Sequence, residues 1–250
     1  KPNYECRTEP WSDLMSSRMA RLGVLVPSVN TTVEAEFNLM APKWCTIHAS
    51  RVMFPRGRRD RYQVFLADIP TETKKLAHTS VKGIALACTM GGLYEGHGSD
   101  VKITDLIQKL SGVPSTTTIS SVLAALRKLH IRRLSVMTPY GEMENRKEKK
   151  FLEESGIEVI SICSMNRKRL LIPNVPSELV YENAIAVDCS GSDGMFISCT
   201  GLATADVLVS LERKFRKPVI SSNQATFWNL LRITKTPFAS PRRFGSLMEE

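Results

Sequence analysis

The chain has 250 residues, enough for one large domain or two small α/β lobes with a sizeable core. Hydrophobic residues make up 42% and charged residues 24%, a balance typical of a globular protein and not of a disordered chain. The formal net charge of +9 comes with only 7% aromatic residues and with basic runs far apart, which argues against nucleic-acid binding and favours a positive field that attracts a small anionic substrate.

The cysteines and histidines are scattered. Six cysteines and four histidines lack the spacing of a disulfide framework or of a zinc site. No run of about 18 apolar residues is present, so we expect no membrane span. Residues 1–20 are polar and lack the apolar segment of a secretory leader, although a leader already removed stays an alternative. We therefore expect no metal and a reducing, cytoplasmic setting.

Short apolar runs alternate with amphipathic stretches, which is the pattern of parallel strands alternating with helices. In chain order, strands are expected at 21–26, 46–52, 83–87 and 114–118, and then at 133–137, 157–162, 194–198 and 218–221. Helices are expected in most of the gaps, for example at 121–129 and 225–231.

The two series of strands resemble each other. Proline follows the first strand of each series at Pro27 and Pro139, and cysteine follows the third at Cys88 and Cys199; the separations are 112 and 111 residues. The fourth strands both begin with proline, 104 residues apart. We infer two copies of one α/β unit. The predicted lobes span 21–127, completed by 233–250, and 128–232, each with a mainly parallel four-stranded sheet.

The matched cysteines point to chemistry. Ligands of open parallel sheets bind beyond the carboxyl ends of the strands, so a cleft between the lobes would receive Cys88 from one side and Cys199 from the other. Backbone amides and a following helix favour the thiolate there. A buried cysteine is often only a small core side chain, but each of these two stands in the same place and precedes threonine. One thiol can add or abstract while the other transfers a proton.

Other strand ends carry polar residues. Asn30 starts a helix, either as part of a carboxylate-binding cradle or as an ordinary N-cap, and spacing alone favours the cap. Tyr140 occupies the place of Ser28 in the second copy and can donate a hydrogen bond to a carboxylate. Asn223 follows the last strand in a similar way, with the cap of the next helix as the alternative function.

Five runs carry a family resemblance: GVLVPSVNTTVEAEF, ACTMGG, TPYGEMEN, FISCTGLATADVLVSLE and KPVISSNQATFWNLL. They resemble the maleate cis–trans isomerase and arylmalonate decarboxylase group of the aspartate/glutamate racemase superfamily, in order over residues 21 to about 232. The resemblance implies two pseudo-symmetric Rossmann-like lobes with the active site between them, no metal or organic cofactor, and a homodimer or homotetramer. Decarboxylases of the group carry glycine at the first cysteine position, so cysteine at both positions disfavours plain arylmalonate decarboxylation.

For a maleate isomerase, the resemblance implies covalent catalysis. The Cys88 thiolate would add to one alkene carbon and Cys199 would protonate the other, so that the central bond rotates and reversal releases fumarate. The resemblance assigns substrate binding to Asn30, Tyr140 and a further asparagine, of which Asn166 is the better match and Asn174 the weaker. It also implies hydrogen-bond donors at Thr89 and Thr200.

One position departs from the group. The first cysteine motif usually reads Cys-Thr-Ser-Gly, whereas this chain has Met90 at the third position, which favours a larger or less polar substrate than maleate. Three alternatives stay open: racemisation of an amino acid such as aspartate by the same thiols, malonate-type decarboxylation, and non-catalytic binding of a dicarboxylate.

Overall fold

The computed structural model describes residues 19–55, 57–165, 172, 175–238 and 242–249. The first half contains β1 (Ala20–Pro27), α2 (Val33–Met40), β2 (Cys45–Val52), α3 (Arg61–Ala77), β3 (Ile84–Leu86), α4 (Thr89–Leu93), α5 (Ser99–Ser111), β4 (Ser115–Thr117) and α6 (Thr118–Lys128). The second contains β5 (Arg133–Thr138), α7 (Glu142–Glu154), β6 (Glu158–Ser164), α8 (Ser177–Ile185), β7 (Gly194–Ile197), α9 (Leu208–Phe215), β8 (Val219–Ser221) and α10 (Ser222–Ile233), followed by the short 3-10 helices η2 (Arg242–Phe244) and η3 (Ser246–Met248).

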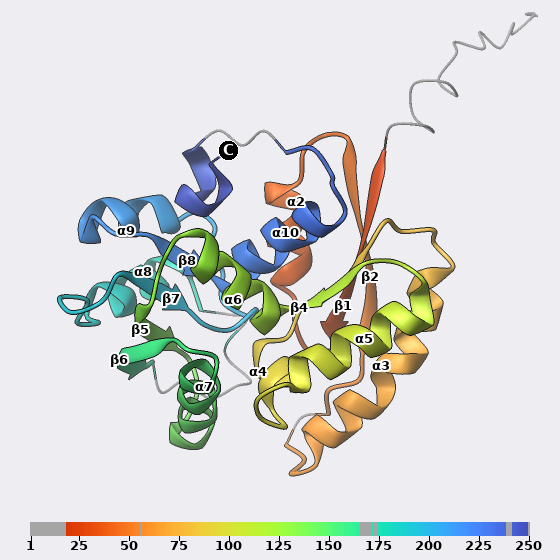
Figure 1. The fold of residues 1–250 in the computed structure, drawn as a ribbon, viewed down its shortest axis with the longest axis horizontal. Coiled ribbons are helices and arrows are strands. Elements are labelled where there is room, and N and C mark those ends of the chain that lie inside the picture. Colours follow the sequence, from red (N-terminus) through yellow and green to blue (C-terminus); the bar gives the residue numbers. More distant parts are fainter. Residues whose placement is uncertain (1–18, 56, 166–171, 173–174, 239–241, 250) are drawn as a thin grey trace, which may run out of the picture.

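The predicted α/β fold is confirmed. The strands form two separate sheets with the orders β2-β1-β3-β4 and β6-β5-β7-β8, and every neighbouring pair is parallel (Figure 1). The same order in both sheets is the pattern that two copies of one unit produce. Every strand begins and ends within two residues of its prediction.

Two helices begin earlier than predicted because their caps lie at the ends of the preceding strands. Thr117 ends β4, and its hydroxyl accepts a hydrogen bond from the Ser120 amide at 3.2 Å. Ser221 ends β8 and forms a reciprocal capping box with Gln224. A capping hydroxyl fixes the first helical turn directly after the strand, so α6 begins at Thr118 and α10 at Ser222.

Helices α6 and α10 lie between the two sheets and contact each other (Figure 1). Helix α6 follows the first sheet but also contacts β8, and α10 follows the second sheet but contacts β3, β4 and α2. Phe227 and Leu230 of α10 accordingly pack in one buried cluster with Leu22, Val24 and Phe37. Phe244 and Met248 near the C-terminus join that cluster. Each lobe therefore contributes one helix to the core of the other. Lobe boundaries at 127 and 232, as predicted from the sequence, do not indicate this exchange of helices.

Equivalent glycines stand where the third strands begin, with Gly83 directly before β3 and Gly194 as the first residue of β7. A Cβ on Gly83 would lie 2.4 Å from a Thr234 methyl and 3.0 Å from the Pro114 carbonyl oxygen. A Cβ on Gly194 would lie 2.6 Å from Ile131 Cδ1 and 2.9 Å from the Pro218 carbonyl oxygen. In both sheets the third and fourth strands thus approach too closely for a side chain at this point.

Alanine at Gly194 is expected to lower the free energy of unfolding by about 1–3 kcal/mol, because the neighbouring backbone must move to admit the new methyl. Urea unfolding of Gly194→Ala measures the loss. Gly141→Ala is the control, since its Cβ would meet only Glu144 Oε2 at an ordinary 3.4 Å. Equal stability of the two variants would contradict the close approach of β7 and β8.

Candidate active site

A cavity of about 430 Å³ lies at the carboxyl ends of β1, β3, β5 and β7. In each sheet these are the two adjacent strands at which the strand order reverses, the position where doubly wound sheets bind ligands. Six of the residues predicted from the sequence line it: Asn30, Cys88, Thr89, Tyr140, Cys199 and Thr200. Asn166 and Asn174 lie outside the described residues.

Cys88 caps a helix. It is the N-cap of α4, and its sulfur accepts a hydrogen bond from the Gly91 amide at 3.3 Å. Only 8% of the residue is exposed. A side chain at Gly91 would come within 2.5 Å of Phe65 Cε1 and 3.0 Å of the Cys88 sulfur, so glycine is needed for the amide to reach the thiol. This is the environment that the sequence predicts for a reactive thiol.

Cys199 differs from its counterpart. Its φ angle is +102°, in a region that non-glycine residues rarely adopt and that costs about 1–3 kcal/mol. The sulfur accepts from the Gly201 amide at 3.4 Å, and the Cys199 amide donates to the Ser222 hydroxyl at 3.0 Å. No helix follows directly, because α9 begins only at Leu208. The expectation of a following helix dipole is therefore wrong for Cys199, whose sulfur meets a turn amide.

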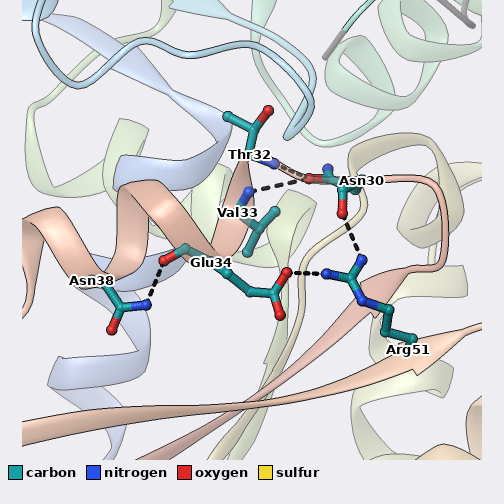
Figure 2. Close-up of polar contacts among 6 residues, drawn as sticks. All are labelled: Asn30, Thr32, Val33, Glu34, Asn38 and Arg51. Carbon is teal, nitrogen blue, oxygen red and sulfur yellow. Dashed lines mark hydrogen bonds and ion pairs between the residues drawn. The ribbon is translucent and has the colours of Figure 1, made fainter. Parts of the chain in front are cut away.

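Asn30 holds the start of α2 and also contacts the second lobe. Its side-chain oxygen accepts from the Thr32 amide at 2.8 Å and the Val33 amide at 3.1 Å, which holds the start of α2 (Figure 2). Its side-chain nitrogen donates to the Thr200 hydroxyl at 3.1 Å, across to the second lobe. The oxygen is thus fixed on the backbone, and the residue lines the cavity.

Arg51 of β2 holds the backbone of Asn30. Its guanidinium donates to the Asn30 carbonyl oxygen at 2.6 Å and forms an ion pair with Glu34 (Figure 2). These contacts, together with the amides above, fix Asn30 from both its backbone and its side chain. Nothing in the sequence pattern indicates this function of Arg51, because it stands on the neighbouring strand.

Hydroxyl groups connect the two cysteine segments. Thr200 donates to the Ala87 carbonyl oxygen at 3.1 Å, and Thr89 shares a 2.9 Å hydrogen bond with Ser222, which also accepts from Cys199. The threonine after each cysteine thus contacts the opposite half of the molecule. These bonds fix the relative position of the two strand ends that carry the thiols.

Asn223 does not cap α10. Its side-chain nitrogen donates to Glu36 at 2.6 Å and to the Thr200 carbonyl oxygen at 3.1 Å, while Ser221 is the cap. Of the two alternatives for Asn223, the helix cap is therefore excluded. The residue stands two positions after the cap, so its side chain reaches into the core and supports the segment after Cys199.

Sequence reasoning missed an ion pair and an aromatic wall in the cavity. Arg61 of α3 donates to Glu144 of α7 at 3.1 Å, and both residues line the cavity. Phe54 and Tyr62 also line it, and their rings are 5.4 Å apart at 78°. Met90 completes this wall and is 2% exposed. The basic run at 56–61 is the only sequence signal that points to Arg61.

The other described cysteines lie away from the cavity. Burial raises the pKa of the Cys45 thiol to about 11, and burial also raises the pKa of Cys189. Both thiols are therefore protonated and unreactive near neutral pH. Within the described ranges no cluster of three or more His, Cys, Asp or Glu residues suits a metal ion, and no helix is long and apolar enough to cross a membrane.

Comparison with known proteins gives the same grouping. Residues 22–244 match the family model for arylmalonate decarboxylase. The chain is 26% identical to the arylmalonate decarboxylase of Bordetella bronchiseptica over 92% of this chain and 96% of that protein. It is 24% identical to the maleate isomerase of Nocardia farcinica over 88% of this chain and 92% of that protein.

One solved structure is similar throughout. It is a cysteine-to-serine variant of the Nocardia farcinica maleate cis–trans isomerase with a covalently bound succinylcysteine intermediate. The TM-score is 0.87 at 22% identity, covering 92% of this chain and 98% of that one. The fold, the matched family model and the relatives agree, and the chain is an enzyme of the isomerase or lyase kind that belongs to the arylmalonate decarboxylase family.

Proposed function

We propose that the protein isomerises maleate, or a close relative of maleate, to fumarate without a cofactor, using Cys88 and Cys199. The observation that carries the proposal is that both thiols line one cavity and each sulfur accepts a backbone N–H. The succinylcysteine intermediate of the similar Nocardia farcinica isomerase supports covalent chemistry. Assembly as a homodimer or homotetramer and a cytoplasmic location stay predictions.

The thiols divide the reaction between them. The Cys88 thiolate adds to one alkene carbon, and the alkene electron pair moves toward the carboxylate on the other carbon. Cys199 gives its proton to that carbon, which leaves a single central bond. After rotation, the Cys199 thiolate removes the proton, the carbon–sulfur bond breaks and fumarate leaves. Every atom of the substrate is retained and no oxidant or reductant is needed.

Neutral donors stabilise the charge that develops on the substrate. Asn30 and Tyr140 both line the cavity and are 6% and 4% exposed. A donor held in place before the reaction needs no reorganisation as charge moves onto a carboxylate, which makes such donors effective. Asn30 is fixed by the Thr32 and Val33 amides and by Arg51.

A proton NMR time course with maleate tests the proposal. Wild-type protein is expected to convert maleate to fumarate at a rate that scales with enzyme concentration. Aspartate and phenylmalonate are run beside it in deuterated water. Exchange of the aspartate α-proton without fumarate formation would replace isomerisation by racemisation, and loss of carbon dioxide from phenylmalonate would replace it by decarboxylation.

Malonate-type decarboxylation is the second candidate. The matched family model and the 26% identical relative both carry that name. The apolar wall of Phe54, Tyr62 and Met90 suits an aryl group. Cysteine at both reactive positions favours isomerisation over this reaction.

A further inference from the structure

Arg61 is an unassigned charge in the cavity. It is the one cation among the described residues that line the cavity, and the steps above do not use it. It is the first residue of α3, where the positive end of the helix dipole disfavours a cation. Glu144 lies in the first turn of α7, on the second lobe, and accepts from Arg61 at 3.1 Å.

The guanidinium has more donors than this pair uses. Besides the bond to Glu144, one terminal nitrogen makes a long 3.4 Å contact with the Arg58 carbonyl oxygen. Nε is buried and has no hydrogen-bond partner among the described residues. A buried donor without a partner costs free energy, which an acceptor brought by a ligand would recover. If the ion pair with Glu144 only joined the lobes, the presence of an unpaired Arg61 Nε–H in a residue that lines the cavity would have no explanation.

The neutrality of the other assigned substrate-binding residues gives the second argument. The residues assigned above to substrate binding, such as Asn30, Thr89, Tyr140 and Thr200, are all neutral. A dianion that enters a largely buried cavity loses hydration and needs a compensating cation. Phe54, Tyr62 and Met90, which line the cavity together with Arg61, lower the local polarity and strengthen such an interaction.

We propose that Arg61 binds a carboxylate of the substrate and thereby selects dicarboxylates over monocarboxylates, while Glu144 is a positioning residue that holds the guanidinium across the cavity. This inference rests on the proposed function in one respect, that the substrate is a dicarboxylate. Arg61 can bind the Glu144 carboxylate and a substrate carboxylate together, because a guanidinium has five N–H donors that reach two carboxylates at once. Turnover itself stays with the thiols.

Isothermal titration calorimetry with unreactive ligands tests selection without requiring turnover. The probes are succinate and monomethyl succinate, which differ by one negative charge. Arg61→Met is expected to weaken succinate binding by about 10- to 100-fold and to change binding of the monoester by less than about threefold. Arg61→Lys keeps the charge but not the planar guanidinium with its paired N–H donors. It is expected to lose less affinity for succinate than Arg61→Met does.

Arg58→Met is the matched control. Arg58 stands three residues before Arg61 and carries the same charge, but its side chain is exposed and paired with Asp60. The control variant is expected to bind both ligands as the wild type does. The assignment would be overturned if Arg61→Met lost equal affinity for the two ligands or lost none. It would also be overturned if the wild type bound succinate no better than the monoester. If Arg61→Met does not fold, the wild-type and Arg61→Lys affinities decide. A wild type that shows the succinate preference but forms no fumarate would refute the isomerase alone.

Discussion

Serine in place of Cys88 is expected to lower kcat/KM for maleate by at least about 10³-fold. A serine hydroxyl ionises far above neutral pH, whereas a thiol that accepts a backbone N–H, as Cys88 does from Gly91, supplies a thiolate nucleophile. Cys199→Ser is expected to lose activity by about 10²- to 10⁴-fold, because the hydroxyl is a poor proton donor to carbon. The NMR assay with maleate measures both losses.

The two variants are expected to differ in what they accumulate. With Cys199 replaced, slow protonation by solvent leaves an adduct on Cys88 whose mass exceeds the protein by one maleic acid. Cys88→Ser is expected to show none. Intact-protein and peptide mass spectrometry after incubation with maleate reads the difference, and the location of the adduct identifies the nucleophile.

Cys163→Ser is the control, since this half-buried thiol on β6 does not line the cavity. It is expected to retain wild-type activity. An adduct found on Cys199, or full activity in Cys88→Ser, would reverse or remove the assigned functions. The strained backbone of Cys199 and the relaxed one of Cys88 already show that the two positions are not equivalent.

The sequence predicts local features of this fold well because they repeat. Apolar runs bounded by Pro27 and Pro139 predict the strands, and the equal spacing of Cys88 and Cys199 predicts that both reach one cavity. Contacts between distant segments leave no such pattern. Arg61 and Glu144 meet only because α3 and α7 approach across the cavity. The crossing of α6 and α10 between the sheets is likewise a matter of packing.

The duplication also produced two buried glutamates in different surroundings. Glu36 and Glu148 stand on the equivalent helices α2 and α7, 112 residues apart, which is the separation of the matched prolines. The Glu36 carboxylate accepts from the Thr204 and Ala205 amides and from Asn223. Neither Glu148 oxygen has a hydrogen-bond partner among the described residues, and nearby Ser198 offers only a weak compensation.

Because Glu148 is buried, its effect on the free energy of unfolding depends on pH. Desolvation raises the pKa of Glu148 from its ordinary 4.5 to about 7, so the folded protein favours the protonated acid. The stability gained from holding this proton in the folded protein is fully present below about pH 4.5, falls as the pH rises, and is lost above about pH 7. Relative to wild type, Glu148→Gln is expected to gain about 3 kcal/mol in the free energy of unfolding between pH 4.5 and pH 8, because an amide does not ionise.

The same substitution at Glu36 is expected to act in the opposite direction. Burial raises the pKa of Glu36 too, but the donors from Thr204, Ala205 and Asn223 converge on its oxygens and lower it in part. A glutamine would turn an N–H₂ group toward at least one of these donors and leave it unsatisfied, at a cost of about 1–3 kcal/mol. Urea unfolding at pH 5 and pH 8 compares the two variants. A loss of stability at pH 8 for both would show that Ser198 holds the Glu148 carboxylate more strongly than the weak compensation described above. Opposite signs would support the difference in hydrogen bonding between the two glutamates.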